Sequence, residues 1–255
     1  MSDEPVVARV HHHVVEDPRP CSYLPSRDAQ LEIRVMDGVS AEDLEALLAR
    51  GWRRFGPVYF RPACVGCAEC VPLRIDVATF APSKSQRRAA KNAARLRRTV
   101  GPPIVDAERL ALYHRWHEQR EAARGWEPTD LDPERYAIDF AFPHPAAREA
   151  AFRDPSDGDR LVGLGLVDEM PGAMSAVYFF WDPDRAPASL GVANVVTLVE
   201  EARAKGMPHV YLGYRVKGCA SLVYKDRYEP HEMLVGRPSF DEAPDWRAAA
   251  PVTRE

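Results

Sequence analysis

The chain has 255 residues, of which 45% are hydrophobic, and its formal net charge is −4. This length allows one large domain or two smaller ones that share a core. The acidic net charge excludes a protein that binds nucleic acid with its whole surface, so such a contact needs a local patch. No apolar run approaches the roughly 20 residues of a transmembrane helix, and residues 1–20 lack the apolar core of a signal peptide. We therefore expect a cytoplasmic protein without a membrane partner.

The first 20 residues contain acids, prolines and the run His11-His12-His13. A histidine run can bind a metal, but its acidic and proline-rich surroundings favour a flexible, solvated leader.

The next part of the chain predicts one helix and two short strands. Ser40 and Asp43 resemble a capping box ahead of leucines at helical spacing. Gly51 then stands where a helix commonly ends. Residues 58–60 and 73–77 have the composition or the alternation of short strands.

The strongest local signal is a second helix that is rich in cations. Ser83 and Gln86 form a capping box at its start, and we expect the helix to run to about residue 98. The segment 84–98 holds no acid and contains Lys84, Arg87, Arg88, Lys91, Arg95, Arg97 and Arg98. Three of these, at positions 87, 91 and 95, line one helix face, where like charges repel. A polyanion would remove that repulsion and release its counterions, so we expect phosphate contact; the alternative is a solvated cationic face.

The second half of the chain predicts a mixed αβ core. Gly101-Pro102-Pro103 indicates a boundary between two lobes. A helix at about residues 107–123 follows, and a proline-rich connector covers residues 127–145. The core elements are then two strands, a helix and a strand, at residues 161–167, 174–181, 192–205 and 209–214. That order is expected of an acetyltransferase-like fold, whereas periodicity alone indicates only a mixed αβ protein.

Three cysteines form the pattern Cys64-x-x-Cys67-x-x-Cys70, which is too tight for a conventional disulfide framework. With Cys21 as a fourth thiolate they would complete a tetrahedral zinc or iron–sulfur site. The alternative is a set of small thiols on a tight loop. Cys219 lies far from this group, and we interpret it as structural.

Two segments of the second half carry candidate binding residues. Gly191 opens a helix whose free backbone N–H groups can hold a phosphate or an oxyanion. The segment 211–214, with Lys217, Tyr224 and Lys225, combines aromatic and cationic groups that can stack on a terminal adenosine and neutralise phosphate. The alternative is an ordinary buried strand followed by a surface loop.

Other polar residues give a weaker signal. Asp168, Ser175 and Tyr178 lie in predicted strands and face either a site or the solvent. His231 is interpreted as a surface or core residue. No Ser–His–Asp or Cys–His arrangement has a recognisable local signature.

Together these pieces resemble the bacterial aminoacyl-tRNA–protein transferase family, which includes the aspartate/glutamate leucyltransferases and is related to the eukaryotic arginyl-tRNA–protein transferases. The resemblance covers about residues 21–234. It rests on collinear motifs: Cys21–Pro25, Gly51–Gly56, Tyr59–Arg74, Ser85–Asn92, Leu166–Asp168, Ser175–Tyr178, Leu190-Gly191, Tyr211–Tyr214, Tyr224-Lys225 and Pro230–Glu232.

The resemblance implies transfer of an amino acid, leucine in the first place and arginine as the other candidate, from aminoacyl-tRNA to the N-terminal Asp or Glu of an acceptor protein. Such transfer marks the acceptor for N-end-rule degradation and needs no cofactor. It also implies an α+β fold with these parts: a flexible leader (1–20), a small cysteine-containing lobe with the basic helix (21–100), an acetyltransferase-like (GNAT-like) lobe (101–240) and a tail (241–255).

The residue patterns and the resemblance together predict the site residues. We expect catalytic roles for Tyr178, Tyr214 and Lys225. We expect tRNA or substrate contacts from Lys84, Ser85, Gln86, Arg87, Arg88, Lys91, Arg95, Gly191, Lys217 and Tyr224. The acceptor's acidic side chain needs a cation, for which the candidates are Arg87, Arg88, Lys217 and Lys225.

Three positions, Ala188, Arg215 and Ser221, depart from the pattern of this family and leave the transferred amino acid open. Two other functions therefore stay open as well. One is a coenzyme-A-dependent N-acetyltransferase on the same fold. The other is a non-catalytic tRNA-binding paralogue.

Overall fold

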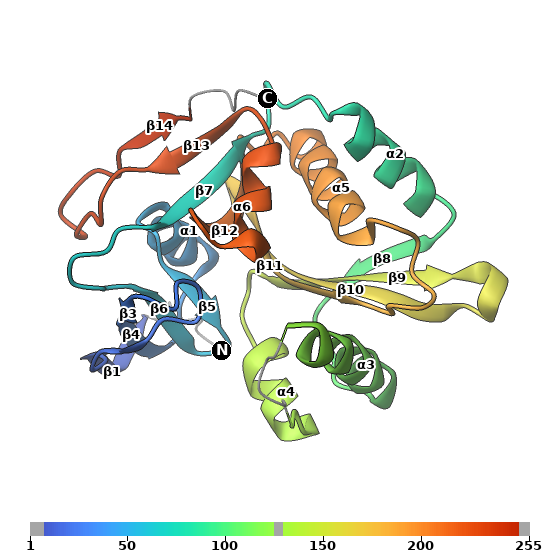
Figure 1. The fold of residues 1–255 in the computed structure, drawn as a ribbon, viewed down its shortest axis with the longest axis horizontal. Helices are drawn as coiled ribbons and strands as arrows, with labels where there is room; N and C mark the ends of the chain where they lie inside the picture. Colours follow the sequence, from blue (N-terminus) through green and yellow to red (C-terminus); the bar gives the residue numbers. More distant parts are fainter. Residues whose placement is uncertain (1–7, 125–129, 250–255) are drawn as a thin grey trace, which may run out of the picture.

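The computed structural model describes residues 8–124 and 130–249, and an eight-stranded sheet forms its core (Figure 1). The strand order is β14-β13-β7-β12-β11-β10-β9-β8, and every neighbouring pair is antiparallel except β11 and β12. The strands are β7 (Cys70–Asp76), β8 (Arg97–Gly101), β9 (Ala147–Asp154), β10 (Arg160–Glu169), β11 (Ala173–Trp181), β12 (His209–Val216), β13 (His231–Leu234) and β14 (Trp246–Ala248).

A second sheet of four strands, in the order β1-β4-β6-β5, lies beside the large sheet and close to helix α1 (Ala41–Ala49). Its strands are β1 (Arg9–Val15), β4 (Leu31–Asp37), β5 (Arg53–Phe55) and β6 (Val58–Pro62), and a two-stranded ladder joins β2 (Arg19–Pro20) to β3 (Asp28–Ala29). The prediction of a flexible leader is wrong for β1, which pairs with β4 along its length. His11 and His13 lie in this strand and contact Asp37 and Glu32. Cross-strand pairing outweighs the polar composition that suggested a solvated segment.

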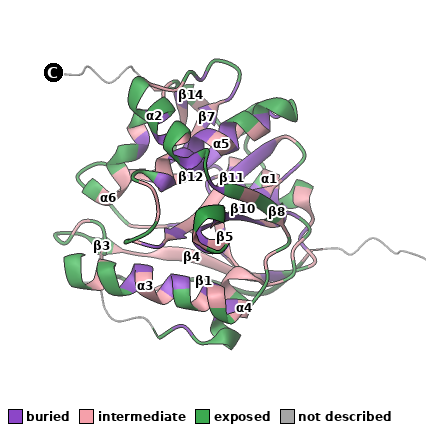
Figure 2. Ribbon diagram, turned by 90° about the vertical axis from the view of Figure 1, so that its right-hand side faces the viewer, coloured by how far each residue is buried: buried purple, intermediate pink, exposed green. Residues whose placement is uncertain are grey.

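Helices cover both faces of the large sheet (Figure 1). On one face α2 (Lys84–Ala93) packs against α5 (Leu190–Ala204), and on the other lie α3 (Ala107–Arg124) and α4 (Pro133–Phe140). Figure 2 shows buried and exposed residues alternating along α3, as expected of a helix with one apolar face on a sheet. Two further short elements are α6 (Ala220–Val223) and the turns of 3₁₀ helix at Pro155–Asp157 and Tyr224–Arg227.

The main predicted elements are confirmed. Both capping boxes are present, at Ser40–Asp43 and at Ser83–Gln86. The predicted core order is also confirmed, because β10, β11, α5 and β12 follow one another and β11 runs parallel to β12. The fold is therefore a mixed αβ fold with the connectivity expected of an acetyltransferase-like core.

The prediction that the basic helix runs to residue 98 is wrong. Helix α2 ends at Ala93, and residues 97–101 form β8, which pairs with β9 at the edge of the large sheet. Pairing with a long neighbouring strand overrides the helical continuation that composition favoured. Arg95 therefore does not extend a helical row of cations, and it forms an ion pair with Asp154.

Strands from both predicted lobes share the large sheet. β7 and β8 come from the first lobe, so the predicted boundary at residues 101–103 does not coincide with a break in this sheet. Within the predicted connector, residues 133–140 form α4, whereas residues 127–129 lie outside the described part of the chain. The predicted tail contributes β14, whose Trp246 donates a hydrogen bond to the carbonyl of Ala49.

The parallel pair β11–β12 is short. It extends over three residue pairs, from Ala173–His209 to Ser175–Tyr211, and the two strands then part. Beyond that point β11 stays paired with β10, while β12 pairs with β7 after an irregularity between Tyr211 and Tyr214. Gly213 lies in this irregularity with φ of 79°, a backbone conformation that favours glycine.

No helix of the described residues is both long and apolar enough to cross a membrane.

Candidate active site

A half-buried cation, with donor atoms removed from solvent, lies where β11 and β12 part. Arg53 of β5 stands 5.6 Å from the ring centroids of both Tyr211 and Tyr214 on β12. Its Nε and Nη2 atoms are buried and have no hydrogen-bond partner among the described residues. Burial lowers the pKa of Arg53, because removal from water disfavours the charged form. Unpaired donors of this kind are costly unless a ligand supplies an acceptor.

Lys225 is a second cation of this centre. It is 8% exposed, and its Nζ donates a hydrogen bond to the backbone carbonyl of Tyr214 at 2.7 Å. A Cβ atom at Gly213 would stand 3.4 Å from Lys225 Nζ and 3.7 Å from Arg53 Nε, so both cations lie against this glycine of β12. Burial, followed by the charge of Arg53, lowers the pKa of Lys225 to about 7. A lysine in this state is partly neutral near physiological pH and can accept a proton.

The residue after Arg53 points to the other face of β5. Arg54 is buried and forms an ion pair with Asp168 of β10, which is 2% exposed. This pair neutralises Arg54 and leaves Arg53 as the cation of β5 without a carboxylate contact among the residues described. The assignment of Asp168 to the solvent is thereby excluded.

The predicted catalytic residue Tyr178 lies on β11, on the other side of the point where the strands part. Its hydroxyl group lies 3.0 Å from Nε2 of His117 on α3. Phe55, on the same face of β5 as Arg53, packs edge-on against the Tyr178 ring at 6.2 Å. Strand β5 thus contacts β12 through the side chain of Arg53 and β11 through the side chain of Phe55.

The structure therefore brings Tyr214 and Lys225 together and places Tyr178 on the neighbouring strand. The Tyr214 hydroxyl group donates to the backbone carbonyl of Gly51 at 2.7 Å, and burial raises its pKa. That hydroxyl group is held by the backbone, which favours a role for Tyr214 in positioning Arg53 and Lys225.

The cations of α2 form a separate, exposed surface. Lys84, Arg87, Arg88 and Lys91 are exposed, and none of them makes an ion pair with a described carboxylate. Below we call these four residues the α2 cations. Gln86 differs from them, because it is buried and its side-chain amide contacts the backbone N–H of Ser83 and the carbonyl of Arg227. The prediction that Gln86 contacts substrate is therefore corrected to a role in fixing the start of α2.

The other predicted binding residues are dispersed. Lys217 and Ser85 are exposed, and Tyr224 is 41% exposed. Gly191 lies in the first turn of α5, where an added Cβ atom would stand 3.6 Å from the ring of Phe179. His231 is buried and contacts the carbonyl of Tyr228, which agrees with its interpretation as a core residue.

Two of the three residues that depart from the family pattern contact a neighbouring side chain. Arg215 forms an ion pair with Asp226 at 3.0 Å, and Ser221 lies 3.1 Å from the thiol of Cys219. Ala188 is exposed, and nothing in the described contacts explains it.

The four cysteines predicted to bind a metal lie near one another but do not form a metal-binding group. Burial raises the pKa of Cys70 to about 12, and the neighbouring thiols of Cys64, Cys21 and Cys67 add to that rise. Within residues 8–124 and 130–249, no group of three or more His, Cys, Asp or Glu side chains is arranged to hold a metal ion. The zinc or iron–sulfur site therefore stays a prediction.

Arg53 is the main residue that sequence reasoning missed. It occurs in the motif Gly51–Gly56, but its partners on β12 lie about 160 positions further along the chain, beyond the reach of any local spacing. The one local signal is its place directly after the buried Trp52, at the start of the three-residue strand β5.

Comparisons with known proteins match both halves of the chain. The family descriptions "Arginine-tRNA-protein transferase, N terminus" and "Arginine-tRNA-protein transferase, C terminus" match residues 19–88 and 108–235. The "Aspartate/glutamate leucyltransferase" of Helicobacter hepaticus is 33% identical over 227 residues, covering 89% of this chain and 93% of the relative. The one of Chromobacterium violaceum is 36% identical over 231 residues, covering 90% and 93%.

Among solved structures, L-PGS from Bacillus licheniformis is 18% identical with a TM-score of 0.44, over 78% of this chain and 60% of that one.

The mixed αβ fold with its buried cationic centre, together with these matches, defines an aminoacyltransferase. The chain belongs to the arginine-tRNA–protein transferase family, and its bacterial relatives are named aspartate/glutamate leucyltransferases.

Proposed function

We propose that this protein is a cytoplasmic enzyme that transfers leucine from leucyl-tRNA to the N-terminal Asp or Glu of acceptor proteins and so marks them for N-end-rule degradation. One observation carries the proposal: the two matches to the arginine-tRNA–protein transferase family include both parts of the buried centre. Arg53 lies in the region that matches the N-terminal half of the family, and Lys225 lies in the region that matches the C-terminal half. The two regions meet at Gly213.

The reaction forms an amide from an activated ester. The acceptor's α-amine attacks the ester carbonyl carbon of leucyl-tRNA, a negative charge develops on the carbonyl oxygen, and the C–O bond to the terminal ribose then breaks. The hydroxyl group of that ribose is the leaving group, and the amine loses one proton. An α-ammonium group has a pKa of about 8, so a group that accepts this proton near neutral pH accelerates the attack.

Lys225 and Arg53 suit these two tasks. The lowered pKa of Lys225 leaves part of the population neutral, and its amine then accepts the proton of the acceptor. The unpartnered Nε and Nη2 groups of Arg53 donate to the developing oxyanion, which needs fixed donors more than the ground-state carbonyl does. Tyr178 and its partner His117 border the same region on the β11 side.

The α2 cations are the proposed tRNA contact. They are exposed and lack carboxylate partners among the described residues, so an RNA backbone would meet no competing ion pair. Arg95, Arg97 and Arg98 are paired with Asp154, Asp159 and Glu201 and contribute less. Lys217 and Tyr224 remain candidates for contact with the acceptor end of the tRNA, because both are exposed and precede Lys225 closely in the sequence.

A transfer assay tests the function. The protein is incubated with radiolabelled leucyl-tRNA and peptides that begin with Asp, Glu or Ala. The proposal expects label in the Asp and Glu peptides and none in the Ala peptide. A protein that binds leucyl-tRNA but labels no peptide would instead be a binding paralogue, and protection against unfolding by coenzyme A but not by tRNA would indicate an acetyltransferase.

A further inference from the structure

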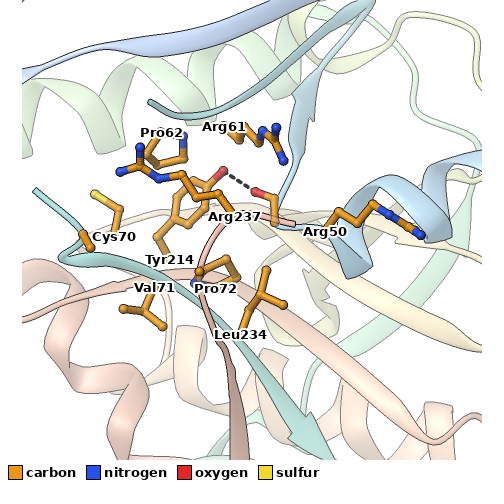
Figure 3. Close-up of a pocket in the computed structure, with 12 residues that line it drawn as sticks. Arg50, Arg61, Pro62, Cys70, Val71, Pro72, Tyr214, Leu234 and Arg237 are labelled. Atoms are coloured by element: carbon orange, nitrogen blue, oxygen red, sulfur yellow. Dashed lines mark hydrogen bonds between the residues drawn. The ribbon is translucent and has the colours of Figure 1, made fainter. Parts of the chain in front are cut away.

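A small cavity of about 160 Å³ shares Tyr214 with the buried centre (Figure 3). Its walls come from the end of α1, from β6, from the start of β7 and from the loop after β13. Three of its lining residues are arginines, Arg50, Arg61 and Arg237, and none is acidic. We call this cavity the arginine pocket. Three positive charges around one small cavity stand out in a chain whose net charge is −4.

Two of these arginines have no carboxylate partner within the described residues. Arg50 donates its hydrogen bonds to backbone carbonyls, those of Ala46, Ser239, Phe240 and Glu242. Arg237 donates to the carbonyls of Cys64 and Cys67. Backbone carbonyls orient a guanidinium group but carry no net charge, so two positive charges remain uncompensated. Arg61 alone is neutralised, by Glu32 at 2.7 Å.

The rest of the wall is mainly apolar and rigid. Pro62, Pro72 and Leu234 line the cavity, and the ring of Tyr214 stands at its floor (Figure 3). Apolar walls polarise less than water and so strengthen the field of the arginines.

We propose that the arginine pocket binds the side-chain carboxylate of the acceptor's N-terminal Asp or Glu. This inference rests on the function proposed above. The cavity has room for such a side chain, since a single water needs only about 10–15 Å³ of comparable space. The Tyr214 ring forms the floor, and the backbone carbonyl of the same residue accepts a hydrogen bond from Lys225. The side-chain carboxylate and the α-amine of the acceptor's first residue therefore bind at neighbouring sites.

Size and lining favour a side chain over an RNA phosphate. A nucleic-acid backbone presents a row of phosphates, which the exposed α2 cations suit better than a small, largely apolar cavity does. The expectation that Arg87, Arg88, Lys217 or Lys225 holds the acceptor's carboxylate is accordingly replaced by Arg237 and Arg61, with Arg50 contributing its charge.

The test compares peptides that begin with Asp and with Asn, which differ in charge but hardly in shape. Two variants each remove one guanidinium donor from the pocket: Arg237→Gln also removes a positive charge, whereas the double variant Glu32→Gln with Arg61→Gln removes an ion pair, keeps the net charge and leaves no unpaired carboxylate behind. For each we expect kcat/KM with the Asp peptide to fall about 10- to 100-fold, the loss of one charge-assisted hydrogen bond, while the value with the Asn peptide stays unchanged. The KM for leucyl-tRNA should not change.

Arg9→Gln is the matched control, because it removes the same charge from an exposed position of β1 outside the pocket, and its Asp-to-Asn preference should equal that of the parent. An unchanged preference in both pocket variants, each shown to fold by circular dichroism, overturns the inference. A raised KM for leucyl-tRNA with an unchanged preference also overturns it and assigns the pocket to RNA phosphate. If the parent protein transfers leucine to no peptide, the proposed function itself fails.

Discussion

Replacing Lys225 by methionine should make the protein more stable at neutral pH and inactive. The lysine amine is buried next to Arg53, and its charged form loses hydration that the hydrogen bond to the Tyr214 carbonyl replaces only in part. Methionine keeps most of the length of the side chain and carries no charge. The variant therefore separates the energetic cost of this group from its chemical use.

The magnitude follows from proton linkage. The pKa of Lys225 falls from 10.5 to about 7 on folding, so between these values the unfolded chain binds more protons than the folded one, and stability rises with pH. At about 1.4 kcal/mol per pKa unit, the buried lysine costs on the order of 4 kcal/mol at pH 7 and 2 kcal/mol at pH 9. Loss of its hydrogen bond costs the variant about 1 kcal/mol. Lys225→Met should thus be more stable by about 3 kcal/mol at pH 7 and by about 1 kcal/mol at pH 9.

Urea unfolding of both proteins from pH 6 to pH 10 measures this difference, and the other titrating groups cancel because both chains contain them. Leucine transfer is measured in parallel at pH 7, where the variant should have lost it. Two free-energy curves that stay parallel over the whole range would show that Lys225 keeps its ordinary pKa, and the assignment of a neutral proton acceptor would fall with it.

Three further predictions concern the same centre and the tRNA surface. Arg53→Met should lower kcat by about 10²- to 10³-fold with little change in KM, as measured by steady-state kinetics. A rise in KM of the same size with unchanged kcat would instead assign Arg53 to substrate binding. Gly213→Ala should destabilise the protein by about 1–3 kcal/mol in urea unfolding, because alanine is strained at φ of 79°. The double variant Arg87→Glu with Arg88→Glu should weaken tRNA binding and lower the salt slope by about 2; an unchanged slope would exclude α2 as the contact.

Local signals predicted the helix starts and the core order β10, β11, α5 and β12, but not strands β1, β4, β8, β9, β13 and β14 or helix α4. Ser83 and Gln86 predicted the start of α2 because a capping box acts within four residues. The strands and helix of the core were also predicted, since each one shows its own periodicity. Sequence could not predict where α2 ends, because that is decided by the pairing of residues 97–101 with β9, about 50 positions away.

The site was predicted only in part, for the same physical reason. Lys225 and Tyr214 were found because they lie close together in an aromatic and cationic stretch. Arg53 and Arg237 were not found, because the residues around them are far away in the sequence. Arg53 contacts the tyrosines of β12, and Arg237 lines the arginine pocket together with residues of α1, β6 and β7. Burial of a charge is a property of the assembled fold, and no spacing in the chain encodes it.

The most direct test of the central claim is a competition between two donors. The protein receives equal amounts of leucyl-tRNA and arginyl-tRNA, labelled with different isotopes, together with a peptide that begins with Asp. The account predicts that leucine label appears at the peptide's N-terminus and that arginine label stays on its tRNA. Arginine label in the peptide would contradict leucine as the transferred residue, and no label from either donor would contradict the transfer reaction itself.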